Sequence, residues 1–357
     1  MKKFLSLILL LLSLIVLVSC SFQLNSFSRS YTYFDSYETI TIWTKGSEKS
    51  LDKYFNETNS ILKKYHILTN RYEEETNGYK GVYYLNHHQN EEVTVEKELI
   101  DLLDETITFL KDNPTFYNYF TIGIGSISDI WHETFENYNE ASSCEKEKVT
   151  ELPSGAFNDT TYNTSIDDIV IDKDKSTVTL KNGVSLDLGG VVKGYVSKIL
   201  IDYYNENNLN YTVDMGQSNI YTNIGNPKRK NNAYLIGLKS PDAGCDDSNK
   251  TYSVVTLPLN HSIVTSGDYQ KYFTYEGRIY SHILDKNTKQ PVVTNIRSIS
   301  IITTDSFIGD IYSTCLFMAG ASETINIVNS IDNLECILYT NDNQIVYSSG
   351  MEQYIQE

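Results

Sequence analysis

Basic residues are scarce in this sequence. Its 357 residues include 29 lysines and arginines against 46 aspartates and glutamates, which gives a formal net charge of -17 at pH 7. A chain this acidic is a poor candidate for binding nucleic acid, and an anionic membrane surface would mildly repel it. We therefore expect no nucleic-acid partner, and any membrane attachment must come from another source.

Cysteine is also rare, and its spacing matches no known framework. Apart from Cys20, the chain has Cys144, Cys245, Cys315 and Cys336, whose spacings fit neither a metal knuckle nor a disulfide scaffold. Two disulfides could form outside the cytoplasm, but Cys315 and Cys336 lie in apolar runs, as core residues do. The sequence favours free thiols.

Several common catalytic signatures are missing. The chain has no Gly-x-Ser-x-Gly elbow, no paired-histidine zinc motif and no nucleotide P-loop. Their absence excludes the commonest hydrolase and kinase classes. The chain also shows no internal repeat and no linker beyond residue 30, which predicts one compact unit over residues 31–357.

A long apolar run occurs at the N-terminus. Lys2 and Lys3 precede apolar residues from 4 to 18, and the run closes on Leu-Val-Ser-Cys at residues 17–20. This pattern predicts a signal peptide over residues 1–19. Its end resembles the lipobox of bacterial lipoproteins, whose cysteine is lipidated and becomes the new N-terminus. We expect lipidation at Cys20, a tether over residues 20–30, and a lipid-anchored protein at the extracytoplasmic face of the bacterial cell membrane. The alternative is an ordinary membrane-anchor helix.

The remaining chain mixes helical and strand patterns without regular alternation, which predicts an α+β fold with a strand-heavy second half. Helices are expected at 51–68, 97–110, 192–203 and 309–319. Strands are expected at 39–43, 93–95, 170–171, 177–180, 211–216, 234–238, 253–259, 262–265, 278–283, 298–303, 335–339 and 345–347. Residues 120–125 suggest a strand or turn, and residues 69–80 and 132–165 suggest a loop and a surface excursion.

The stretch from Ser185 to Leu200 is the first candidate site. It reads as a short apolar strand that ends at Asp187, a turn at Gly189 and Gly190, and then a helix. Free N–H groups at the start of such a helix can face a phosphate, with a cation beside Asp187. The alternative is an ordinary glycine turn.

A second candidate lies on the helix expected at 309–319. Asp310 and Thr314 are four residues apart and share a helix face, where they offer the hard oxygen donors that Mg²⁺ accepts. Alternatively, Asp310 only favours the helix dipole and the Thr314 hydroxyl bonds its own backbone. A third candidate, His282, lies in an apolar strand and is either a base near pH 7 or a satisfied core residue.

These pieces occur together and in order, and from about Phe34 onward the chain resembles the ApbE family of FAD:protein FMN transferases. The similar blocks are residues 34–41, 123–131, 187–195, 216–220, 265–269 with 281–285, and 310–314. The chain departs from the family pattern at Thr121, where an aspartate is expected, and at Gln217, Lys286 and Lys289, which replace glycine, proline and glycine.

The resemblance implies an ApbE-type fold and a set of site residues. Asp310, Thr314 and the Gly190 backbone would hold Mg²⁺, and His282 or Asp285 would deprotonate the acceptor. FAD would contact Asp187 and Lys193, while its flavin would be lined by Phe34, Tyr72, Tyr119, Phe120, Thr121 and Leu284.

The implied reaction is Mg²⁺-dependent transfer of FMN from FAD to a threonine or serine hydroxyl of an exported protein, with release of AMP. An FAD pyrophosphatase and a non-catalytic FAD-binding lipoprotein are the alternatives. A solute-binding lipoprotein of a transporter is a more distant one, and it would require two similar α/β lobes. The chain has no Asp-x-x-Ser/Thr-Gly/Ser-Ala-Ser/Thr segment to accept flavin itself.

Overall fold

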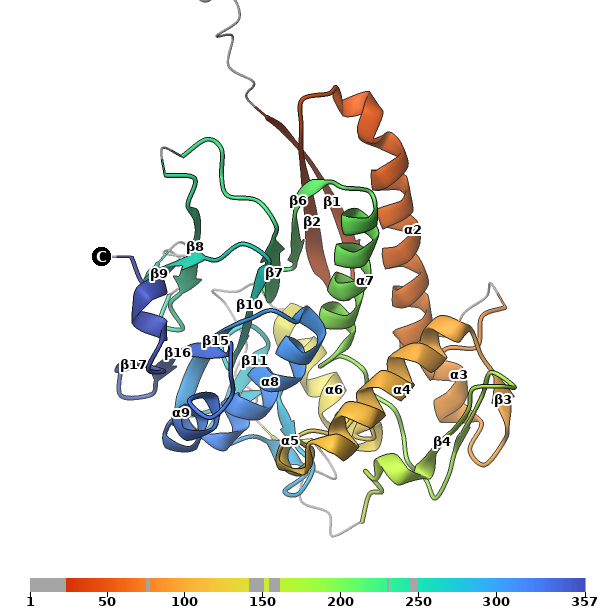
Figure 1. The fold of residues 1–357 in the computed structure, drawn as a ribbon. Coiled ribbons are helices and arrows are strands. Elements are labelled where there is room, and N and C mark those ends of the chain that lie inside the picture. The colour runs from red at the N-terminus through yellow and green to blue at the C-terminus, as the bar shows by residue number, and fades with distance from the viewer. Residues whose placement is uncertain are drawn as a thin grey trace, which may run out of the picture.

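An eight-stranded antiparallel sheet forms the centre of the computed structural model, which describes residues 24–74, 78–140, 151–153, 161–229, 231–243 and 250–356 (Figure 1). Its strands run in the order β1-β2-β6-β7-β10-β15-β16-β17. Their bounds are Asn25–Tyr33, Ser36–Thr44, Asn210–Met215, Asn219–Thr222, His261–Gly267, Ile296–Thr303, Glu335–Thr340 and Ile345–Tyr347. The antiparallel sheet with separate helices confirms the α+β prediction.

Alternating side chains give the middle of this sheet two buried faces. Val264 and Ile301 point into the main core, whereas their neighbours Ile263 and Ile302 point into a second core. The second core is closed by the hairpin of β8 (Tyr234–Lys239) and β9 (Thr251–Leu257) and by the turn Met351–Tyr354. Because both faces are covered, β15 is buried along almost its whole length.

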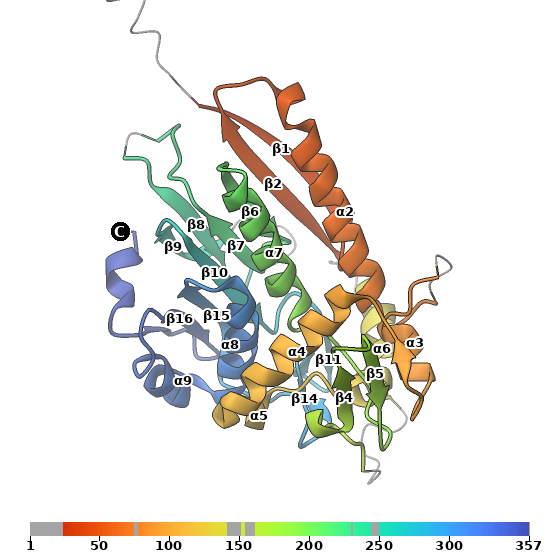
Figure 2. The same cartoon turned by 45° about the vertical axis from the view of Figure 1, so that its right-hand side comes forward.

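Three long helices cover the main-core face: α2 (Asp52–Thr69), α7 (Val192–Glu206) and α8 (Ser306–Ala319). α7 lies between the other two and packs against both, as Figures 1 and 2 show. α4 (Lys97–Asp112) packs beside α2, and its apolar residues at helical spacing are buried as expected. The sequence therefore predicted α7 and α8, the two helices that carry Lys193, Asp310 and Thr314.

Smaller elements complete the described chain. The helices are α3 (Val82–His87), α5 (Pro114–Tyr119), α6 (Gly125–Glu140) and α9 (Ala321–Val328), with 3₁₀ turns at Glu48–Leu51 and Ile166–Asp168. The short strands are β3 (Val93–Thr94), β4 (Ile169–Asp172), β5 (Thr177–Leu180), β11 (Tyr272–Tyr275), β12 (Arg278–Ser281), β13 (Leu284–Asp285) and β14 (Gln290–Pro291).

Several expected boundaries were wrong. β1 begins at Asn25, so residues 25–30 belong to the sheet and not to a tether. Neither 120–125 nor 185–187 forms a strand; a single bridge joins Ile124 to Ser185, and α6 starts at Gly125. The expected surface excursion begins inside α6, where Trp131 and Phe135 form a separate apolar cluster with β11 and β12. The helices α3 and α5 were not expected from the sequence.

Cys315 and Cys336 are buried free thiols, as the sequence favoured. Cys20, the predicted signal peptide, Cys144 and Cys245 lie outside the described residues. In the part of the chain that the structure describes, no helix is both long and apolar enough to cross a membrane.

Candidate functional site

The glycine stretch and the Asp310 helix meet in space. The backbone N–H of Gly194, in the first turn of α7, donates to Oδ2 of Asp310 on α8 at 2.5 Å. A Cβ atom at Gly194 would lie 2.4 Å from the carbonyl oxygen of Ser306 and 2.8 Å from Cγ of Asp310. Glycine is therefore required here because the backbones of the two helices approach so closely.

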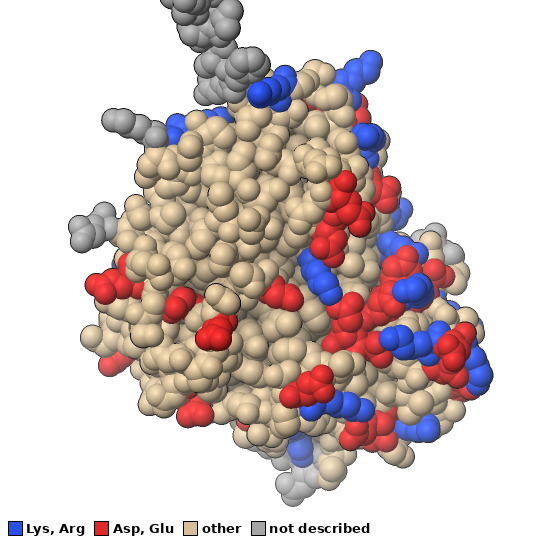
Figure 3. Space-filling view, viewed as in Figure 1, with Lys and Arg blue, Asp and Glu red and all other residues tan. Residues whose placement is uncertain are grey.

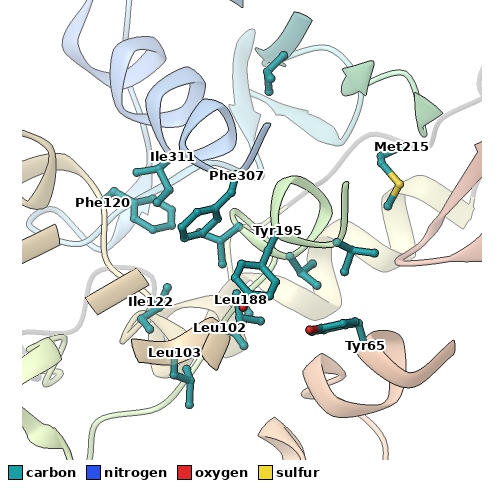
Figure 4. Packing of buried hydrophobic residues seen from close by; sticks show 14 of the residues in the cluster. Tyr65, Leu102, Leu103, Phe120, Ile122, Leu188, Tyr195, Met215, Phe307 and Ile311 are labelled. Carbon is teal, nitrogen blue, oxygen red and sulfur yellow. The ribbon is translucent and has the colours of Figure 1, made fainter. Parts of the chain in front are cut away.

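Local sequence explains why α8 presents Asp310 at this point. Asp305 caps the helix, because its Oδ1 accepts from the backbone N–H groups of Phe307 at 2.9 Å and Ile308 at 3.0 Å. One turn later Asp310 falls on the inward face of the helix and is only 8% exposed. Figure 4 shows Phe307 and Ile311 of the same helix packed near Phe120 and Tyr195, which form an apolar base below the polar groups.

The Asp310 carboxylate is held by hydrogen bonds in a buried position. Burial raises its pKa to about 6, although the nearby Lys193 ammonium, the Gly194 N–H and the Asn219 amide act in the opposite direction. No salt bridge to this carboxylate occurs among the described residues. A buried carboxylate of this kind is favoured in its charged form only if a cation approaches it.

Asn219 is a site residue that the sequence analysis did not single out. Its amide Nδ2 donates to the Ser306 carbonyl at 3.0 Å and to Asp310 Oδ1 at 3.4 Å. The amide oxygen, Oδ1, is buried and has no hydrogen-bond partner in the described part of the chain. An unsatisfied buried acceptor costs free energy, so this atom calls for a donor or a cation. The only sequence signal was its place in the block at residues 216–220.

The Thr314 hydroxyl donates to the carbonyl oxygen of Asp310 at 3.1 Å, which is the local contact that the sequence left open as an alternative. Donation uses its only hydrogen and leaves lone pairs on the oxygen. Asp310, Asn219 and Thr314 thus supply one carboxylate and two neutral oxygens. Among the described residues no group of three or more acidic, histidine or cysteine side chains forms a metal cluster.

The turn before α7 is built from Asp187, Gly189 and Gly190. Oδ1 of Asp187 accepts from the N–H of Gly189 at 2.9 Å, which closes a tight turn. A Cβ atom at Gly190 would lie 2.8 Å from the ring of Phe120, so the Gly190 backbone lies directly against that ring. The structure therefore brings Phe120 to the glycine turn.

Arg71 donates hydrogen bonds to the segment before this turn. The sequence did not identify it as a site residue. Its guanidinium is buried; Nε donates to the Leu186 carbonyl at 3.2 Å and Nη2 donates to the Gly125 carbonyl at 2.8 Å. Nη2 also lies 2.8 Å from Asp129, and Nε lies 4.0 Å from Asp187. No sequence pattern marked Arg71, because its partners are distant in the chain.

Tyr72 follows Arg71 and stacks on His132, with ring centres 3.8 Å apart. Its side chain is 44% exposed, so one part of the ring is open to solvent. The Arg71 guanidinium lies 4.9 Å from the ring centre of Tyr72. Arg71 therefore lies between Tyr72 and Asp187, two residues that the family resemblance assigns to FAD.

Phe34 lies at the tip of the β1–β2 hairpin. Phe34 and Asp35 have φ values of 47° and 53°, in the left-handed region that non-glycine residues seldom adopt. The N–H of Phe34 donates to Nδ1 of His66 at 3.3 Å. Next to this tip, Glu38 is fully buried and its carboxylate accepts from the Tyr33 N–H at 3.0 Å. Burial raises the pKa of the Glu38 carboxyl, against the lowering effects of the hydrogen bonds from Ser36 and the backbone and of the Lys193 ammonium.

His282 is exposed at the end of β12, and its Nδ1 lies 3.0 Å from the Lys271 carbonyl. Because a carbonyl oxygen only accepts, Nδ1 carries the proton and Nε2 presents a lone pair. Although the side chain reaches solvent, neighbouring protein atoms desolvate the ring and, with the charges of Lys271 and Lys193, lower the pKa of His282, against the hydrogen bond to the Lys271 carbonyl and the charge of Asp187. The imidazole is therefore neutral at pH 7 and has the tautomer of a base.

The side chains of the other predicted site residues make contacts within their own turns or with the core. Asp285 accepts from the Asn287 N–H at 2.8 Å inside the β13–β14 turn, and Leu284 lies partly buried on β13. The Thr121 hydroxyl donates to the Thr164 carbonyl at 2.8 Å and accepts from the Gly123 N–H at 3.1 Å, so it serves the backbone. Tyr119 ends α5 and packs against the main core.

Comparisons with known proteins show which family the chain resembles. The family model of the ApbE family matches residues 34–338. A Klebsiella pneumoniae protein named FAD:protein FMN transferase is 26% identical over 260 residues, which cover 72% of this chain and 73% of that protein. A Treponema pallidum protein of the same name is 24% identical over 47% of each chain.

Two solved structures have a similar fold. The ApbE protein of Thermotoga maritima superimposes with a TM-score of 0.74 and 22% identity, covering 93% of this chain and all of that one. The flavin transferase ApbE of Vibrio cholerae gives a TM-score of 0.69 and 18% identity over 93% of this chain. The family match extends over most of the sequence and includes every block on which the site is built. The chain belongs to the ApbE family.

Proposed function

We propose that this protein is an FAD:protein FMN transferase, which moves FMN from FAD to a threonine or serine hydroxyl of an exported target and releases AMP. Family membership and the names of its relatives support this proposal. The observation that carries it is the contact between Gly194 and Asp310, because it joins the glycine turn to a buried carboxylate. A diphosphate needs both kinds of group: N–H donors and a place for a cation.

The residues present fit Mg²⁺. Asp310 supplies a carboxylate, the amide oxygen of Asn219 has no other partner, and Thr314 keeps free lone pairs. Mg²⁺ prefers such hard oxygens and completes its shell with water and phosphate. The Gly190 carbonyl is a further candidate. When bound, Mg²⁺ neutralises charge on the phosphate oxygens of the substrate.

The chain's own groups supply the remaining parts of the reaction. The lone pair on Nε2 of His282 takes the proton of the acceptor hydroxyl, whose oxygen forms a bond to the phosphorus of the FMN half. The bond between that phosphorus and the bridging oxygen breaks, and AMP leaves with the bridging oxygen. Lys193 and the N–H groups of the glycine turn orient the diphosphate, and Phe34, Phe120 and Tyr72 offer aromatic surface to the flavin.

His282→Ala should greatly reduce FMN transfer while FAD binding, followed by flavin fluorescence, stays close to that of the unchanged protein. Loss of one general base costs about 10²- to 10⁴-fold in rate. Asp285→Asn tests the other candidate base, and transfer should largely be kept, because the Asp285 carboxylate is engaged within its own turn. Full transfer activity in His282→Ala would exclude the proposed base.

One assay separates the proposed function from its alternatives. The protein is incubated with FAD, Mg²⁺ and a candidate exported acceptor protein, and the products are examined for in-gel flavin fluorescence and free FMN and AMP. A transferase yields a fluorescent acceptor and AMP. Free FMN with AMP would indicate a pyrophosphatase, and intact bound FAD would indicate a binding protein.

We also propose that the mature protein is anchored outside the cytoplasm by lipid on Cys20. The support is the sequence pattern at residues 1–20. Mass spectrometry of the N-terminal peptide from cells tests this, because a diacylglycerol on a cysteine at the mature N-terminus is expected.

A further inference from the structure

An apolar hollow lies beside the first described residue, away from the candidate site. It has a volume of about 910 Å³ and is lined by Leu24, by the β7–β8 connection and by the β9–β10 turn. Pro227, Pro258 and Leu259 contribute to its wall, and Leu259 is 51% exposed. The exposed residues Lys228 and Arg229 follow the lining residue Pro227 directly in the chain, and we name them the rim. The hollow and this rim together are the anchor-side surface.

The charge of this surface is opposite to that of the whole chain. No aspartate or glutamate occurs between residues 215 and 241, which include the β7–β8 connection, or between residues 251 and 267, whereas the whole chain carries 46 acidic residues. Lys228 is fixed at the rim: its Nζ donates to Ser26 Oγ at 3.0 Å and lies 5.6 Å from the ring centre of Trp43. Arg229 follows it in the same connection. On the face drawn in Figure 3, basic side chains lie at the end where β1 begins, and acidic and basic side chains are mixed over the lower part.

If Cys20 carries the proposed lipid, the short chain between Cys20 and the hollow keeps the anchor-side surface close to the membrane. Cys20 and Leu24 are four positions apart, and a fully extended chain spans at most about 3.6 Å per residue. The lipidated residue therefore lies within about 14 Å of Leu24. A basic rim around an apolar surface at this distance suits the interface of an anionic bilayer.

We propose that the anchor-side surface docks on anionic lipid headgroups and sets the orientation of the whole protein. This inference goes beyond the proposed transfer activity and rests on lipidation of Cys20. The strand β1 has nine residues and runs from the hollow toward the site. At about 3.4 Å per residue, its far end and Phe34 lie about 27 Å from Asn25. Docking would therefore hold the candidate site away from the headgroups, where an exported acceptor can reach it.

Fluorescence quenching tests this orientation on the mature lipidated protein in vesicles with brominated acyl chains. Leu259→Trp places a reporter at the hollow, and Val293→Trp places one at a distant position that is 74% exposed. The native Trp43 and Trp131 are common to both. In phosphatidylglycerol vesicles we expect quenching of the Leu259→Trp signal and none of the Val293→Trp signal.

Charge reversal separates docking from mere tethering. Lys228→Glu with Arg229→Glu should abolish the quenching of the Leu259 reporter, because the headgroups now repel the rim. Lys173→Glu with Lys175→Glu makes the same change of charge on the exposed β4–β5 turn and should preserve the quenching.

Four results would overturn the proposal. The first is equal quenching of the two reporters in protein whose N-terminal mass shows lipidated Cys20. The second is quenching that is the same in phosphatidylcholine vesicles and unaffected by reversal at Lys228 and Arg229. The third is a dimer in solution that buries Leu259. Loss of the lipid itself also overturns it, while failure of FMN transfer in the soluble assay bears only on the proposed function.

Discussion

At the scale of single residues, the site depends on buried polar atoms that the folded chain leaves without full partners. Asp310 has only neutral hydrogen-bond donors and the more distant charge of Lys193, and Oδ1 of Asn219 has no partner among the described residues. Neither group stabilises the fold by itself, because burying a polar atom without a full set of partners costs free energy. Both groups can instead bind a cation, which the proposed reaction needs.

The charge of Asp310 should make the metal-free protein less stable at high pH. Its pKa is raised from 3.8 to about 6, a difference worth about 3 kcal/mol. Because the folded state binds the proton more tightly than the unfolded state, this stabilisation is complete below pH 3.8 and is lost as pH rises through 6. Asp310→Asn has no such proton and should not show this loss.

Urea unfolding in EDTA at pH 4 and pH 8 measures this effect. Between the two pH values, the unfolding free energy of the unchanged protein should fall by about 2 kcal/mol relative to Asp310→Asn, because a part of the effect is already lost at pH 4. A constant difference between the two proteins would contradict the buried state of the carboxylate. The asparagine can still accept the hydrogen bond from Gly194, so its fold should be kept.

At the scale of elements, the site depends on the close packing of α7 against α8. Gly194→Ala places a Cβ atom 2.4 Å from the Ser306 carbonyl, so the two helices must move apart. We expect a loss of about 1–3 kcal/mol in unfolding free energy, as for other overpacked positions, together with weaker Mg²⁺ binding.

Thermal unfolding with and without Mg²⁺ checks this prediction. Gly46→Ala is the matched control, because its Cβ would meet side chains and no backbone: Ser50 Oγ at 3.0 Å, which can rotate, and Thr44 Oγ1 at 3.4 Å, which is an ordinary contact. If Gly194→Ala unfolds at the same temperature as the unchanged protein and binds Mg²⁺ equally well, the close approach of α7 to α8 is not needed.

The elements also show what the sequence could and could not predict. α4 and α7 were predicted because their apolar residues recur at helical spacing, which is a local property. The start of α6 was missed because Gly123 and Gly125 suggested a strand or turn. A Cβ at Gly125 would lie 2.7 Å from the Leu186 carbonyl, so this glycine serves a contact between distant segments. Arg71 and Asn219 were missed for the same reason, because their partners lie far away in the chain.

At the scale of the whole molecule, the acidic chain has one basic, apolar end next to its proposed anchor. The predicted repulsion between an acidic protein and an anionic membrane therefore does not apply to the surface that would face the membrane. The total charge can be counted from the sequence, but only the fold shows that the β7–β8 connection and Leu24 meet.

Cys20→Ser should release the protein from the membrane fraction, because the proposed anchor is the lipid carried by this cysteine. The basic rim alone would hold the protein only weakly and in a salt-dependent way. Fractionation of cells at low and high salt measures this. Retention of Cys20→Ser in the membrane at high salt would contradict the lipid anchor and support the alternative of an uncleaved anchor helix.

The Asp310 carboxylate, which packs against the start of α7 after the glycine turn, is proposed to support flavin transfer by holding a divalent cation. The most direct measurement compares the unchanged protein with Asp310→Ala for FMN transfer to an acceptor protein, with Mg²⁺ and with EDTA, read as in-gel flavin fluorescence. We predict transfer only by the unchanged protein with Mg²⁺, while circular dichroism shows that the variant is folded. Undiminished, EDTA-resistant transfer by Asp310→Ala would contradict the account.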